Sequence, residues 1–215
     1  MLAAQRHVRQ IAYRPGERLV DQLRPDDDIV EVTLDFLEAL APGEPWTVKD
    51  VIEDAAVRAD VVAVATVDTV DTALALDESW IDTRLFGTVE EVLRSSSLSK
   101  LQPKQRFEAH ISGGEIVLGT VRVRAGAVSP VSLPQVPEHR RYLLFLEQSP
   151  SALYTLHPAL LVENGKLKYV KPFRPQYLPP NPLEGLSLKE VAEVVRAVKT
   201  SRMVQGKTII VPAGR

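Results

Sequence analysis

The sequence has no cysteine among its 215 residues, which excludes disulfides, thiolate metal sites and cysteine nucleophiles. It has little net charge, because 26 Lys+Arg against 28 Asp+Glu leave only -2. That balance gives no overall electrostatic reason to bind nucleic acid or an anionic membrane. The densest apolar run, residues 61–67, is far too short to span a bilayer, and residues 1–14 lack the apolar core of a signal peptide. We therefore expect a soluble protein, either cytoplasmic or from an envelope with its leader removed.

The charges that are present are unevenly distributed. Residues 1–60 carry 7 Lys+Arg and 13 Asp+Glu, a net charge of -6, and residues 187–215 carry 6 and 2, a net charge of +4. The segment between them carries 13 of each sign. The oppositely charged ends predict docking onto the central segment or onto another molecule, with little energy from the charges themselves.

Hydrophobic periodicity separates helices from strands. Residues 47–58 predict a helix capped by Thr47, and a capping box at Ser187 opens a second helix that reaches about residue 200. Residues 29–40 have apolar residues at helical spacing and predict a short helix or an ordered arm. The strand candidates are residues 61–67, 81–93, 106–111, 116–124, 142–147, 153–156 and 167–170. The turns between them include Gly113-Gly114, expected as a hairpin turn, and Asn164-Gly165, expected as a tight one.

Many short strands with such turns indicate a mainly β fold with flanking helices (α+β). We expect an OB-like antiparallel barrel with N- and C-terminal helices. The predicted organisation has three parts. Residues 1–46 form an N-terminal arm or short helix, residues 47–170 the barrel with its leading helix, and residues 171–215 a proline-rich connector, a helix and a tail packed on the barrel. The predicted core comprises Val62, Val64, Leu85, Val89, Leu93, Leu144 and Leu146.

Three segments of the chain resemble a loose group of uncharacterised bacterial proteins. They are residues 58–67 (RADVVAVATV), 87–93 (GTVEEVL) and 141–147 (RYLLFLE). The group looks like OB-type five-stranded barrels, distantly similar to netrin-like modules, and the resemblance covers roughly residues 48–170. The chain departs from the pattern at Arg94-Ser95 and at residues 138–140. It also lacks the cysteine that netrin-like protease inhibitors direct at a catalytic metal, so no site residue is carried over.

No residue pattern predicts a catalytic, cofactor-binding or metal site. The histidines, at positions 7, 110, 139 and 157, have no ligand spacing and are expected as surface or structural residues. Asp26-Asp27-Asp28 is expected as a solvated acidic turn rather than a cation site. Glu90 and Glu91 point to opposite faces of a strand, so they cannot act on one bond. The protein is therefore not expected to be an enzyme or to need a cofactor.

Two functions remain as hypotheses. The first is a non-catalytic binding or assembly module that contacts a protein partner or a second copy of itself. The alternative is an OB-type protein that binds single-stranded nucleic acid through exposed aromatics together with Arg84, Arg122 and Arg124. The neutral charge of the central segment favours core positions for Phe86, Phe107 and Phe145 over base stacking. The tail at residues 208–211 is expected to pair as a strand on a sheet edge.

Overall fold

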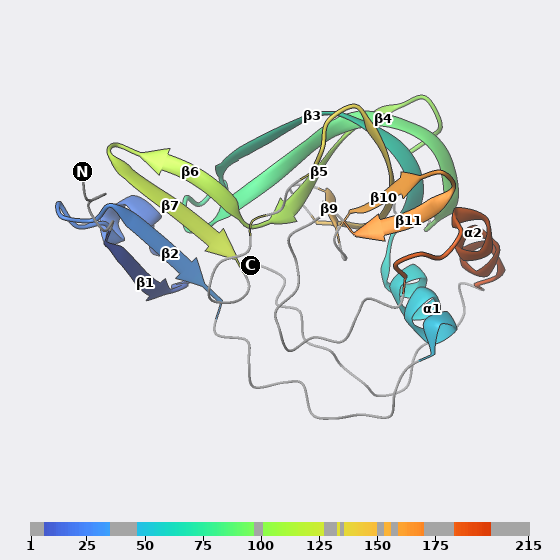
Figure 1. Ribbon diagram of the computed structural model, residues 1–215, viewed down its shortest axis with the longest axis horizontal. Coiled ribbons are helices and arrows are strands. Elements are labelled where there is room, and N and C mark those ends of the chain that lie inside the picture. The colour runs from blue at the N-terminus through green and yellow to red at the C-terminus, as the bar shows by residue number, and fades with distance from the viewer. Residues whose placement is uncertain are drawn as a thin grey trace, which may run out of the picture.

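The computed structural model describes residues 7–34, 47–96, 101–126, 133, 136–149, 153–155, 159–169 and 183–198. The strands of these ranges form two sheets, drawn at opposite ends of the molecule in Figure 1. The four-stranded sheet has the order β1 (Val8–Ala12), β2 (Ile29–Thr33), β7 (Val121–Gly126), β6 (Gly114–Leu118). The seven-stranded sheet has the order β11 (Lys166–Tyr169), β10 (Leu160–Glu163), β8 (Arg140–Gln148), β3 (Val61–Leu74), β4 (Ile81–Ser95), β5 (Arg106–Ser112), β9 (Leu153–Thr155). The helical segments are η1 (Leu19–Gln22), α1 (Val48–Arg58) and α2 (Leu188–Ala197).

The predicted OB-like antiparallel barrel is wrong, although the mainly β character with flanking helices is right. The described strands belong to two open sheets instead of one closed barrel, and β1, β2 and β7 run parallel to one another. The three-residue strand β9 adds short pairings to both β5 and β8. Alternating hydrophobicity identifies strands, but it does not identify their partners, and so it cannot distinguish a single barrel from two sheets.

A long, bent hairpin of β3 and β4 connects the two sheets (Figure 1). Its register shifts at three places, after Val62, Val64 and Val67, and such bulges bend a strand pair. Near its start, alternate side chains of β3 enter different clusters. Val62 and Val64 pack with α1 and α2, while Val61 and Ala63 pack on the other face with β5 and β8. At its far end, Leu74 and Ile81 join the core of the four-stranded sheet.

The chain leaves one sheet and enters the other at Gly113-Gly114. The prediction of a hairpin turn here is wrong, because β5 and β6 belong to different sheets and do not pair. Gly113 has a φ of 106°, and a Cβ there would lie 2.8 Å from the backbone oxygen of Ala125. The predicted strand over residues 116–124 is instead the hairpin β6–β7, with Gly119 in its turn. The glycine pair therefore permits a close backbone approach where the chain changes sheets.

The N-terminal arm forms part of the four-stranded sheet. The chain runs from β1 through η1 to β2, and the helix expected over residues 29–40 is wrong at residues 29–33, which form β2. Val30 and Val32 point into the core with Val123 and Trp80. The spacing of four residues from Val30 to Leu34 misled the prediction, because residues four apart lie on one face of a helix and also on one face of a strand.

Both predicted helices are confirmed, with their caps. Thr47 and Ser187 each form a capping box, with Asp50 and Glu190 respectively. The two helices share a core cluster with the outer face of the seven-stranded sheet. Neither α1 nor α2, the α-helices in the described ranges, is long and apolar enough to cross a membrane.

The predicted core is confirmed at all seven positions, where exposure is 7% or less. The turn at Asn164-Gly165 is also confirmed, with φ values of 52° and 74° between β10 and β11. The proline-rich connector and the tail at residues 208–211 lie outside the described residues.

Candidate functional site

Strand β1 forms one edge of the four-stranded sheet in the described part of the chain. The backbone N–H of Ile29 donates to the carbonyl of His7, and that of Tyr13 donates to the carbonyl of Thr33. In a parallel pair, residues that bond to the neighbouring strand alternate along the chain. The odd-numbered residues of β1 therefore bond to β2, and the backbone groups of Val8 and Ala12 point away from it.

A buried ion pair fixes the connection that follows β1. Arg9 donates from Nε to Asp27 Oδ1 at 2.7 Å and from Nη2 to Asp27 Oδ2 at 2.5 Å, and the backbone N–H of Arg24 donates to Oδ2 at 2.7 Å. The Asp27 side chain is 2% exposed and that of Arg9 is 17% exposed. The hydrogen bonds from Arg9 lower the pKa of Asp27 from 3.8 to about 2, and the same contact raises the pKa of Arg9. The expectation of a solvated acidic turn is therefore wrong at Asp27.

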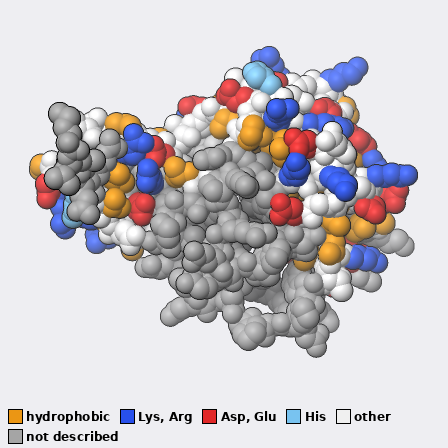
Figure 2. All heavy atoms as spheres, viewed as in Figure 1, with side chains coloured by type: hydrophobic (Ala, Val, Ile, Leu, Met, Phe, Trp, Pro, Cys, Tyr) orange, Lys and Arg blue, Asp and Glu red, His pale blue; other side chains and the backbone are white. Residues whose placement is uncertain are grey.

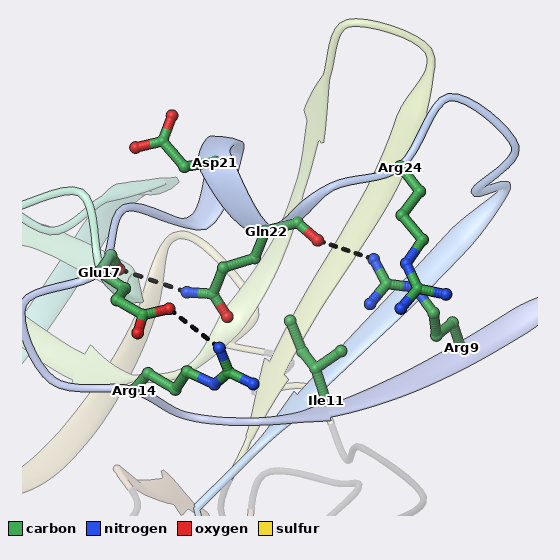
Figure 3. Close-up of a pocket in the computed structure, with 7 residues that line it drawn as sticks. All are labelled: Arg9, Ile11, Arg14, Glu17, Asp21, Gln22 and Arg24. Carbon is green, nitrogen blue, oxygen red and sulfur yellow. Dashed lines mark hydrogen bonds and ion pairs between the residues drawn. The ribbon is translucent and has the colours of Figure 1, made fainter.

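Beside this ion pair lies a pocket of about 190 Å³ (Figure 3). Its lining residues are Arg9, Ile11, Arg14, Glu17, Asp21, Gln22 and Arg24. One part comes from β1 and the residues just after it, and the rest from the connection through η1. Arg9 and Ile11 stand on the same face of the sheet as the core residues Val30 and Val32, so the pocket lies between this face of the edge strand β1 and the η1 connection.

Two exposed side chains of opposite charge, Arg24 and Asp21, lie toward opposite ends of this pocket, whereas Arg9 and Arg14 are paired with Asp27 and Glu17. Figure 3 shows Arg24 beside Arg9 at one end, and Asp21 on the side of Glu17 and Arg14. Arg14 Nη1 lies 3.2 Å from Glu17 Oε2. The side chains of Arg24 and Asp21 form no salt bridge with any residue that the structure describes, and both are exposed.

The outer face of the four-stranded sheet carries a network of paired charges. Arg124 Nε donates to Glu115 Oε2, and Arg122 Nη1 donates to Glu115 Oε1, each at 2.7 Å. Arg124 also lies 3.7 Å from Glu31, which is 6% exposed. Arg84 likewise pairs with Asp71 at 3.2 Å. The three arginines that the nucleic-acid hypothesis assigned to phosphates are therefore already paired with carboxylates.

The aromatic residues of that hypothesis lie mostly inside the protein. Phe107 and Phe145 are buried at 7% and 1%, as expected for core residues, and Phe86 is half-buried. Tyr142 is buried and donates its hydroxyl hydrogen to the Pro137 carbonyl at 2.7 Å, and burial raises its pKa. Buried rings are not available for base stacking.

A second polar cluster surrounds His110 on β5. Its Nδ1 lies 3.4 Å from the buried Asp82 and its Nε2 lies 3.2 Å from Glu108, so the ring stands between two carboxylates. Ser112 lies two residues further along the strand, but its Oγ accepts a 2.7 Å hydrogen bond from Trp80 Nε1. Both ring nitrogens of His110 face carboxylates and not Ser112, so the cluster lacks the geometry of a nucleophile activated by a histidine.

The remaining predicted residues are dispersed. His7 and His139 are exposed at separate places in the fold, and His157 lies outside the described residues. Glu90 and Glu91 have different partners, Arg141 and Arg196 respectively. Within the described ranges, no three His, Asp or Glu side chains are grouped so that they could hold a metal ion. Sequence reasoning missed the β1 pocket, for which the only local signal was a concentration of arginines before residue 25.

Comparison with models of protein families gives no match for this chain. Comparison with curated proteins gives no match either. The resemblance to uncharacterised bacterial proteins stays a prediction, and the described strands form two open sheets in place of the closed barrel that it implied.

Proposed function

We propose that this protein is a non-catalytic binding or assembly module that acts through contacts with other proteins. One observation carries the proposal. Of the five large hydrophobic residues exposed in the described ranges, four lie on the four-stranded sheet or immediately beside it. They are Val8 (46% exposed), Val20 (44%), Leu76 (92%) and Val117 (62%).

These four residues belong to one end of the molecule. Val8 and Val117 stand on the outer face of the sheet, in one cross-strand row with Ile29 and Arg122. Val20 and Leu76 belong to adjacent segments, because the N–H of Leu19 donates to the carbonyl of Glu78. Hydrophobic side chains are visible on the surface of this end, at the left of Figure 2. Exposed apolar side chains at one end of a molecule supply surface that the apolar side chains of a partner can cover.

A nucleic-acid partner has less support. Affinity for a phosphate backbone requires unpaired basic side chains along a groove. Arg84, Arg122 and Arg124 instead have carboxylate partners. A partner with its own apolar surface suits this end of the molecule better.

The proposal is tested by capturing partners on the immobilised full chain, combined with size-exclusion chromatography and light scattering. We expect the wild-type protein to self-associate or to capture a partner. The double variant V20S/L76S should weaken the capture of a protein partner roughly tenfold, since each exposed apolar side chain contributes about 0.5–1.5 kcal/mol when it is buried.

The matched control is Val48→Ser, which changes an exposed valine on α1, distant from the four-stranded sheet. It should leave the association unchanged. A strict monomer that captures nothing would contradict the proposal. So would tight binding of single-stranded oligonucleotides in a fluorescence-polarisation titration at low salt.

A further inference from the structure

The β1 edge has the hydrogen-bonding groups needed to accept another strand. The backbone groups of Val8 and Ala12 point away from β2, as the bonds of His7 and Tyr13 to β2 require. An edge strand of this kind is a template for pairing with a further chain. In such complexes, main-chain hydrogen bonds supply affinity and side-chain pockets supply specificity.

Strand β1 carries one charged residue, the inward-pointing Arg9, but lacks three other features by which proteins block edge pairing. It contains no proline, no lysine and no bulge in its register with β2. The β11 edge of the seven-stranded sheet differs, because a neighbouring backbone segment covers it. There the N–H of Leu167 donates to the carbonyl of Leu186, and the N–H of Gly185 donates to the carbonyl of Leu167. The β11 edge is therefore covered by another segment of backbone, unlike the β1 edge in the described part of the chain.

The charges beside β1 favour a second copy of this chain as the partner that pairs with the β1 edge. Arg24 lies at the Arg9 end of the pocket and Asp21 toward the Arg14 end, with no salt bridge from either side chain to a described residue (Figure 3). A two-fold axis perpendicular to the sheet would place the Arg9 end of one chain beside the Arg14 end of its partner. Each Arg24 would then face the Asp21 of the other chain. This edge is thus electrostatically complementary to itself, as an isologous interface requires.

Extending the proposed function, we propose that a second copy of this chain binds at this edge, with the two β1 strands antiparallel about an axis beside Gln10. Val8 of each chain then pairs with Ala12 of the other, and the two four-stranded sheets become one continuous sheet. The two pockets lie on the same face of that sheet and form one groove across the axis. The interface is small, so the dimer is expected to be weak and to depend on concentration.

Two sets of variants test the dimer by sedimentation velocity at low ionic strength, over a series of micromolar concentrations. Ala12→Pro removes an N–H that points away from β2, and Ala12→Ser is its control, because serine keeps that N–H. Arg24→Asp and Asp21→Arg each place like charges across the axis, while the double variant R24D/D21R restores complementarity. Thermal unfolding of every variant confirms that it is folded.

We expect A12P and each single charge reversal to weaken dimerisation roughly tenfold or more. A12S and R24D/D21R should dimerise within about threefold of wild type. Amide hydrogen exchange at Val8 and Ala12 should slow as the concentration rises. Rescue by the double reversal is the result expected when residue 24 of one chain faces residue 21 of the other.

Other outcomes overturn the proposal, and they separate it from the proposed function. A dimer that A12P leaves intact forms elsewhere, so this interface is wrong while the binding function stands. A monomer that binds a different protein, and loses it on A12P, likewise overturns the dimer and leaves the binding function standing. A monomer that binds no protein at all refutes both.

Discussion

Replacing Asp27 by asparagine should remove the strongest polar contact of the N-terminal arm. The carboxylate accepts two hydrogen bonds from Arg9, at 2.7 and 2.5 Å, and one from the backbone of Arg24. Asparagine keeps the size but turns one accepting oxygen into a donor, so a guanidinium N–H at a nearly buried site loses its partner. Hydrogen bonds to charged groups contribute about 1.5–3 kcal/mol. A pKa of about 2 in place of 3.8 corresponds to at most about 2.4 kcal/mol. We expect Asp27→Asn to lower the free energy of unfolding by about 2 kcal/mol near neutral pH.

The dependence of this loss on pH distinguishes the ion pair from simple packing. The folded state lowers the pKa of Asp27, so the stabilisation is complete above about pH 5 and disappears as the pH falls through about 2. Urea unfolding followed by tryptophan fluorescence should therefore give curves that differ near neutral pH and converge at about pH 2. Asp26→Asn is the control, because Asp26 is exposed and forms no salt bridge with a described residue. Equal stability of wild type and Asp27→Asn at neutral pH would refute the reasoning, as would a difference that persists in acid.

Two further substitutions, each compared with a control substitution, test the packing. Leu144→Ala removes a side chain that is 1% exposed and should cost about 2–5 kcal/mol in chemical denaturation, whereas Leu76→Ala, at 92% exposure, should cost less than about 0.5. Gly113→Ala should cost about 2–4 kcal/mol, because its Cβ would lie 2.8 Å from the Ala125 oxygen at a φ of 106°. Gly16→Ala, where φ is 80° and nothing lies within 4 Å, should cost only about 1 kcal/mol. If the two glycine variants lost similar amounts of stability, the passage of the chain from one sheet to the other would not require glycine at position 113.

The candidate site could not be predicted from the sequence, because its residues come together only in the folded chain. Asp27 and its neighbours have the pattern of a solvated acidic turn, because adjacent like charges are usually exposed. Its partner Arg9 lies 18 positions earlier, and only the parallel pairing of β1 with β2 brings the two side chains together. The exposed Asp26 and Asp28 behave as the pattern predicts, so the error is confined to the residue that the fold buries.

Local chemistry was sufficient for the elements whose evidence lies within a few residues. The capping residues Thr47 and Ser187 specify where both helices begin, because their side chains satisfy N–H groups three positions on. The Asn164-Gly165 turn is specified by residues that accept positive φ, and alternating apolar residues specify which side chains are buried.

Only the tertiary structure decided which strands share a sheet. Pairing partners lie far apart in the chain, as β2 and β7 do, and no local pattern encodes their hydrogen bonds. Gly113-Gly114 is suited to a hairpin turn, yet here it lets the chain cross between sheets. A glycine permits both the positive φ of a turn and the close backbone approach of such a crossing. The division into two sheets leaves β1 as an edge strand in the described part of the chain. The surface that we propose for dimerisation is thus a consequence of long-range pairing, while the residues on it were set by the sequence.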